Sequence, residues 1–192
     1  MILGFNKLLL IVLLVFSVRS DIEERRIPNK TTLPVILWGF ASAGIFSGFN
    51  GILFSLGGFL VGLAVFLIPF SMGGMGAGDV KLMAAVGSLM GWKLTVYSAL
   101  LTAVAGGIIV IGYTIYKGYF LKMLKNIRIS IYKKLLYFSY LFNHNEIILS
   151  KFKTLSGENI NFEREYIPYG VAIAIGTLIV LIGNHFGYPP FI

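Results

Sequence analysis

The chain of 192 residues is 57% hydrophobic and only 12% charged, and its mean hydropathy is +0.84. A soluble domain carries about twice that charged fraction, so the composition indicates an integral membrane protein, which we expect to form a single domain over residues 1–192. Cysteine is absent, which excludes disulfides, thiolate metal sites and cysteine nucleophiles. Neither of the two histidines has a second ligand at metal spacing, so we expect no metal and no other cofactor.

Apolar segments along the chain predict an all-α fold with six transmembrane helices. The expected helices cover residues 3–20, 33–49, 52–72, 80–92, 94–116 and 167–186. The third is long enough to cross a hydrocarbon core of about 30 Å. The fourth rises only roughly 20 Å, so it either begins below the membrane surface or crosses where the bilayer is thinned.

Charge on either side of the first segment decides between a signal peptide and a retained helix. Only Lys7 precedes the apolar run, whereas several basic residues follow it: Arg19, Arg25, Arg26 and Lys30. This asymmetry predicts a retained helix whose C-terminal end faces the cytoplasm. With the N-terminus outside, fourteen of the sixteen Lys and Arg residues fall on the cytoplasmic side, as expected for a multi-pass protein of the inner, or cytoplasmic, membrane.

A long basic segment, residues 117–165, separates the fifth and sixth expected helices. Its apolar residues up to 142 recur at helical spacing, and its lysines lie mostly off that stripe: Lys122, Lys125, Lys133 and Lys134. The pattern predicts an amphipathic helix on the anionic cytoplasmic leaflet. A cytoplasmic extension of the fifth helix and a nucleic-acid patch are alternatives, and we expect no nucleic acid among the partners. Residues 143–164 are polar, and we expect a mobile cytoplasmic loop there.

Glycine gathers in the loop 71–79, where four glycines fall within six positions and Asp79 follows them. Glycine permits positive φ and close approach of another backbone, and a carboxylate between two membrane-grade segments indicates function. The alternative is that Asp79 only caps the next helix. In the third helix, Gly58 and Gly62 form a GxxxG spacing, which indicates either close helix packing or ordinary tolerance of glycine in membrane helices.

The topology brings two acids to the same depth. Asp21 follows the first helix and Asp79 precedes the fourth, both at the cytoplasmic face, whereas the other acids are in polar loops or beside arginines. Two carboxylates held close together share one proton. The ionised one can take a proton from a water that attacks a peptide carbonyl, and the protonated one can donate to the carbonyl oxygen and then to the leaving amine.

Three stretches resemble one family, the type IV prepilin peptidases. Residues 76–79 read Gly-Ala-Gly-Asp, a GxGD motif, and 76–92 resembles the family's corresponding stretch. Asp21, with Ile-Pro-Asn at 27–29, resembles the family's first catalytic aspartate and its flank. Ile-Pro-Tyr-Gly at 167–170 resembles the start of the family's last helix. The resemblance covers nearly the whole chain outside 117–165.

The resemblance implies a membrane aspartyl endopeptidase with its active site facing the cytoplasm. Asp21 and Asp79 would be catalytic, and Gly76 and Gly78 would form the active-site loop. Its partners would be the lipid bilayer and prepilin-like precursors, cut after a glycine that ends a short basic leader. Long bacterial relatives carry a cysteine-containing zinc domain between the first two helices and also N-methylate the product. Here that loop has about a dozen residues and no cysteine, so we expect a peptidase without methyltransferase activity.

Two other functions fit parts of the pattern. An archaeal-type preflagellin peptidase would use the same aspartate chemistry. Paired acids, broken helices and glycine loops also describe proton-coupled transporters, although these place their acids near the bilayer midplane. A catalytically inactive assembly scaffold is disfavoured because both acids keep their flanking residues.

Overall fold

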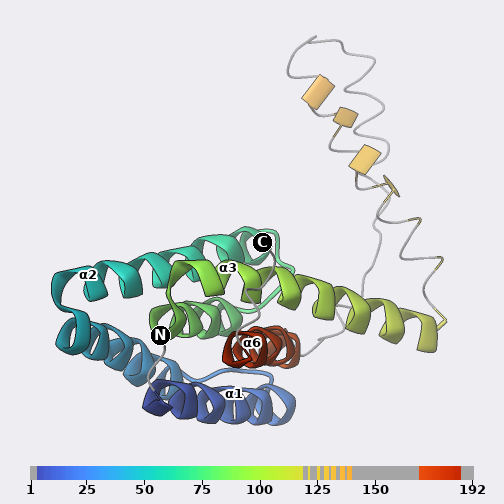
Figure 1. The fold of residues 1–192 in the computed structure, drawn as a ribbon. Helices are drawn as coiled ribbons and strands as arrows, with labels where there is room; N and C mark the ends of the chain where they lie inside the picture. The colour runs from blue at the N-terminus through green and yellow to red at the C-terminus, as the bar shows by residue number, and fades with distance from the viewer. Residues whose placement is uncertain are drawn as a thin grey trace. The chain divides into compact units, whose positions relative to one another are not determined.

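The computed structural model describes residues 4–118 and 169–186, together with helical residues that stand singly or in pairs between 121 and 139. Four helices make up the described part of the chain (Figure 1): α1 (Gly4–Glu24), α2 (Asn29–Ser71), α3 (Ala77–Tyr116) and α6 (Tyr169–His185). No strand occurs among these residues. The prediction of an all-α fold is therefore confirmed.

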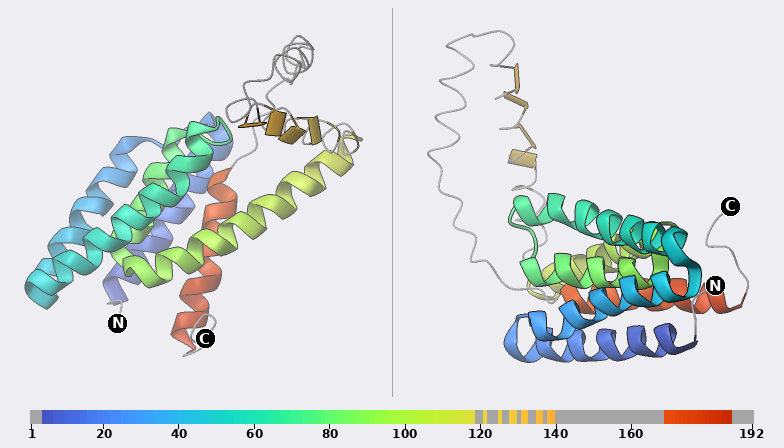
Figure 2. Two further views of the ribbon diagram at one scale, coloured as in Figure 1. Left: turned by 90° about the horizontal axis from the view of Figure 1, so that it is seen from above. Right: turned by 90° about the vertical axis from the view of Figure 1, so that its left-hand side faces the viewer.

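Helices α2 and α3 each turn sharply at a glycine. Gly48 has φ of 59° and Gly91 has φ of 75°, a region that side-chain-bearing residues rarely adopt. Each element therefore consists of two helical segments that double back on one another (Figure 2). The turn predicted at 47–51 is confirmed, and the break expected at Lys93 falls two residues earlier. The six expected helices thus correspond to four continuous elements, two of them bent.

The internal contacts of the chain divide it into two compact units. The first unit comprises residues 1–109 and 166–192, and the second comprises 110–165. Every residue of the candidate site described below belongs to the first unit.

In the second unit, the structure describes only part of the predicted amphipathic segment. Ile131, Leu135 and Phe138 of the predicted apolar stripe are helical and exposed. Of the four predicted membrane-facing lysines, Lys125 is helical and exposed. The other three lysines and the polar loop 143–164 lie outside the described residues.

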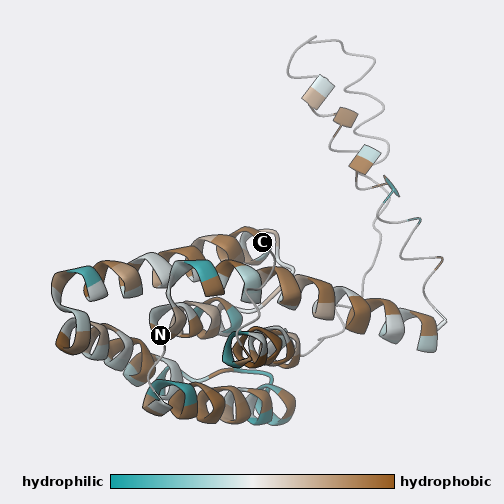
Figure 3. Cartoon of the chain, in the orientation of Figure 1, coloured by the Kyte–Doolittle hydropathy of each residue, from teal (hydrophilic) through white to brown (hydrophobic). Residues whose placement is uncertain are grey.

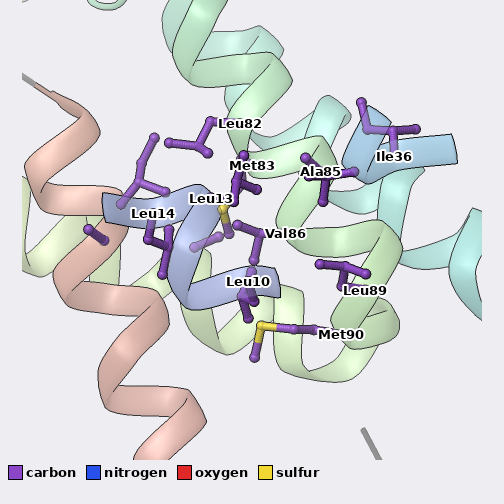
Figure 4. Packing of buried hydrophobic residues seen from close by; sticks show 14 of the residues in the cluster. Leu10, Leu13, Leu14, Ile36, Leu82, Met83, Ala85, Val86, Leu89 and Met90 are labelled. Atoms are coloured by element: carbon purple, nitrogen blue, oxygen red, sulfur yellow. The ribbon is translucent and has the colours of Figure 1, made fainter. Parts of the chain in front are cut away.

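The first segment of α3, residues 77–90, forms the centre of the first unit. From Val80 onward nearly every residue in it is buried, which explains why it is apolar on all sides. Around it pack side chains from α1 and α2 (Figure 4), including Leu10, Leu13, Leu14 and Ile36. We related the shortness of this segment to the thickness of the bilayer. In the structure, the short segment is enclosed by other helices.

Glycines allow α2 to pack closely against this central segment. A methyl group on Gly58 would overlap the backbone carbonyl of Gly87, and one on Gly62 would overlap that of Met83. Between these helices, the Ser55 hydroxyl donates a hydrogen bond of 2.7 Å to the Ser88 carbonyl. Of the two interpretations of the GxxxG spacing, close helix packing is therefore confirmed.

A polar cluster fastens the beginning of α1 to the first segment of α2. The Trp38 indole N–H donates to the Asn6 side-chain oxygen at 3.0 Å, and the Asn6 amide donates to the Ser42 hydroxyl at 3.3 Å. The Phe5 ring packs edge-on against Trp38. Because Asn6 is buried, these bonds satisfy a side chain that would otherwise be costly to enclose.

Two described helices, α2 and α3, are long and apolar enough to cross a membrane, and α6 is apolar but shorter. Hydrophobic residues dominate these helices in Figure 3. Helix α1 is not among the candidate spans, since it carries charged residues near both ends, among them Lys7, Arg19 and Asp21.

Replacing Gly58 with alanine tests the close packing. The added methyl would push against the Gly87 carbonyl, so Gly58→Ala is expected to destabilise the protein by about 1–3 kcal/mol. The matched control is Gly107→Ala, because a methyl there meets nothing within 4 Å. SDS-induced unfolding in mixed micelles measures both variants. Equal stability of the two would contradict the packing described.

Candidate active site

Helix α1 continues through the charged stretch that the sequence analysis interpreted as a loop. It ends at Glu24, so Asp21 lies within the helix instead of after it. Leu10, Leu14, Ser17 and Asp21 follow one another at spacings of four and three residues and are all buried, so the inward stripe of the helix extends to the acid. Asp21 is only 1% exposed.

The connection between α1 and α2 is shorter than expected. Arg25 adopts a positive φ of 54°, which ends α1. Pro28, with extended backbone angles, directly precedes α2, which begins at Asn29, four residues before the expected start. The Ser20 hydroxyl donates to the Arg26 carbonyl at 2.7 Å and fastens the loop to the end of α1.

The beginning of α3 packs against this connection. A methyl group on Gly78 would lie 3.0 Å from Cβ of Ile27 and 3.2 Å from its backbone nitrogen, so only glycine fits without displacing the loop. Nearby, the Lys81 ammonium donates to the Asn29 side-chain oxygen at 2.8 Å. These contacts hold the first turns of α2 and α3 together.

The glycine loop owes little to positive φ. Of its glycines, only Gly73 has one, at 74°, and Gly78 is already helical. Gly78 therefore does not use the positive φ that glycine permits, whereas the expected close approach of another backbone is confirmed at this residue by the contact with Ile27.

Asp79 is the third residue of α3 and is 3% exposed. Its Oδ2 accepts a hydrogen bond of 3.0 Å from the backbone N–H of Gly76, which precedes the helix. An acid at this position that reaches back to the residue before the helix is one half of a capping box. Asp79 therefore caps the helix from within its first turn, and the expectation that it precedes the helix is wrong.

The first turn of α6 completes the surroundings of Asp21. The backbone N–H of Gly170 donates to Oδ2 of Asp21 at 2.8 Å. Beside it, the ring of Tyr169 packs over Gly106. Sequence reasoning did not include Tyr169 or Gly170 in the site. The available signal was a glycine in the first turn of a helix that begins at the same end of the fold as Asp21.

The structure brings both predicted carboxylates to one end of the first unit, where the connection that follows α1 packs against the first turn of α3. Each accepts a backbone N–H at one oxygen, from Gly170 or from Gly76, and this fixes its orientation. Such a pair can divide the work of base and acid. Within the described ranges, no three His, Cys, Asp or Glu side chains converge as a metal-binding group.

Comparison with known proteins identifies relatives. The model of the type IV leader peptidase family matches residues 8–111, more than half of the chain. A prepilin leader peptidase/N-methyltransferase from Aeromonas hydrophila is 34% identical over 116 residues, covering 55% of this chain. One of the same description from Aeromonas salmonicida (strain A449) is 32% identical over 112 residues. The chain spans 38% of the length of either relative. No solved structure matched.

The family match includes Asp21, Asp79 and the two loop glycines Gly76 and Gly78. It ends before α6, so the contact of Gly170 with Asp21 is known only from the structure.

Cross-linking tests the junction of α2 and α3 independently of any activity. Because the chain has no cysteine, a pair of introduced cysteines can be followed without background. The double variant Asn29→Cys with Lys81→Cys should be joined by a short bifunctional thiol reagent, since the native Lys81 side chain reaches Asn29 across a gap longer than a direct disulfide spans. In the control pair, Lys81→Cys with Lys93→Cys, the two positions are separated by about 15 Å of helix and should not react. Equal cross-linking of the two pairs would contradict the geometry.

Proposed function

The chain belongs to the type IV leader peptidase family, and we propose that it is an aspartyl endopeptidase that removes the leader from prepilin-like precursors. One observation carries the proposal: two buried acids from different helices, Asp21 in the last turn of α1 and Asp79 in the first turn of α3, lie at one end of the first unit. The printed names of its relatives, prepilin leader peptidases, support the same substrate class.

The proposed mechanism divides hydrolysis between the two carboxylates. The ionised member accepts a proton from a water molecule as its oxygen attacks the scissile carbonyl carbon. The protonated member donates to the carbonyl oxygen, which gives a geminal diol. As the C–N bond breaks, the first carboxyl passes the proton it took from water to the leaving amine, and a hydroxyl of the diol returns a proton to the second carboxylate. The backbone N–H groups of Gly76 and Gly170 orient the carboxylates throughout, so little reorganisation is required.

The apolar helices and the family together indicate a protein of the inner membrane. We propose that the six helical segments cross it, with the N-terminus outside and the aspartates near the cytoplasmic surface. The distribution of the sixteen basic residues supports this orientation. Both acids lie in terminal turns of their helices, a position that favours a protease over a proton-coupled transporter with acids at the midplane.

We further propose that this protein lacks the methyltransferase activity that its relatives' names include. The loop between α1 and α2 comprises only residues 25–28, and no cysteine is present to bind zinc. Nothing between these helices corresponds to a zinc-bearing domain of the kind expected in the long relatives.

Neutralising either aspartate tests the proposed chemistry. Asp21→Asn and Asp79→Asn are nearly isosteric but cannot take a proton from water, so each should reduce cleavage of a synthetic prepilin peptide by at least about 100-fold. Glu23→Gln is the matched control, since this exposed acid pairs with Arg19 on the outer face of the same helix. Product formation by protein purified in detergent is measured by mass spectrometry.

Substantial turnover by either aspartate variant would remove that residue from the mechanism. If the wild-type protein releases no leader from any prepilin peptide, the proposed activity itself is wrong.

The contact between Gly78 and Ile27 predicts a second effect. Gly78→Val should push the first turn of α3, which carries Asp79, away from the connection between α1 and α2. It should reduce kcat by about 100-fold, because small displacements of catalytic groups are costly. Gly62→Val cannot serve as the control for Gly78→Val, since a side chain at Gly62 meets the Met83 carbonyl. Gly107→Val, in open space, is the appropriate control. Equal activity of the two variants would show that Gly78 has no special role.

A further inference from the structure

The first turn of α6 lies directly against a buried acid of another helix. The N–H of Gly170 donates to Oδ2 of Asp21 at 2.8 Å, across 149 positions of sequence. The first N–H groups of a helix have no partner within the helix, so this one can serve a carboxylate from elsewhere. The positive end of the α6 dipole favours the same arrangement.

Space explains why this residue is glycine. A methyl group at position 170 would lie 2.7 Å from Oδ2, 3.1 Å from Cβ and 3.2 Å from Cγ of Asp21. The φ of Gly170 is not positive, so glycine is not required by the backbone conformation. Within a helix, glycine costs about 1 kcal/mol relative to alanine, and the close approach of the carboxylate is the feature that offsets this cost.

The helix that carries Gly170 is itself firmly seated. At Gly176, two turns further along α6, a methyl would press on the backbone and hydroxyl of Thr102 in α3. Tyr169 and Ala172 both approach Gly106 of α3. Helix α6 is therefore held against α3 independently of Asp21, and the N–H of Gly170 has a fixed position to which the carboxylate conforms.

We propose that Gly170 is a positioning residue, whose N–H and absent side chain set the orientation of the Asp21 carboxylate for proton transfer. This inference deepens the proposed peptidase function, and its catalytic part rests on that function. Gly170 acts through Asp21 and takes no part in bond making or breaking.

The test compares Gly170→Ala with Gly183→Ala, a glycine of the same helix where a methyl meets nothing within 4 Å. With a prepilin peptide, Gly170→Ala should lower kcat by about 100-fold and leave KM within about twofold, because the acid is misplaced while peptide binding is retained. Gly183→Ala should match the wild type in both constants. Equal kcat values for the two variants overturn the proposal.

A second readout is independent of catalysis. Carbodiimide coupling of glycine ethyl ester, quantified at each acid by mass spectrometry, reports how accessible a carboxylate is. In Gly170→Ala the labelling of Asp21 should rise several-fold, whereas that of Asp79 should stay at the wild-type level. Unchanged labelling of Asp21 overturns the inference whether or not the protein cleaves peptides. If the labelling changes as expected but the wild type cleaves nothing, the contact stands and the proposed peptidase function fails.

Should Gly170→Ala fail to fold, glycolic acid in place of Gly170 removes the N–H and adds no bulk. This amide-to-ester replacement should also lower kcat and raise the labelling of Asp21. Wild-type values for both would exclude a role for the N–H group.

Discussion

Two carboxylates buried in an apolar bundle impose the main physical constraint on this protein. A carboxylate removed from water is costly unless hydrogen bonds compensate, and in this fold the compensation comes from backbone N–H groups at helix beginnings. Asp79 takes the N–H of Gly76 at the start of its own helix, and Asp21 takes that of Gly170 at the start of α6. The beginnings of α3 and α6 must therefore lie beside the end of α1.

The central segment of α3 carries this constraint into the rest of the first unit. Its residues 77–90 are enclosed by α1 and α2, and close packing through Gly58 and Gly62 leaves little space for it to shift. Because Asp79 lies in its first turn, the packing of two whole helices determines where that acid lies. The packing of the helices and the geometry of the candidate site are thus coupled. A methyl group that presses on α3 two turns away from Asp79 can disturb both.

The sequence allowed some of these features to be predicted and concealed others for identifiable reasons. Asp21 and Asp79 stood out because they lie between apolar runs, and the GxxxG spacing indicated a packing surface directly. The end of α1 was misplaced because Glu23 and Glu24 suggested a loop, although they occupy exposed positions beside a stripe that remains buried to Asp21. The role of Gly170 depends on a contact between distant helices, and no local pattern encodes it.

The contacts of α6 also explain how the candidate site can keep its geometry although a long segment connects α3 to α6. The entropic cost of closing a loop grows only slowly with its length, so added residues there change the stability little. The position of α6 depends on three contacts: Gly176 packs against Thr102, Tyr169 packs against Gly106, and Gly170 donates a hydrogen bond to Asp21. All three contacts are made by residues of the first unit. The orientation of Asp21 is therefore determined by packing between helices, and the chain that joins α3 to α6 can vary in length and charge without altering it.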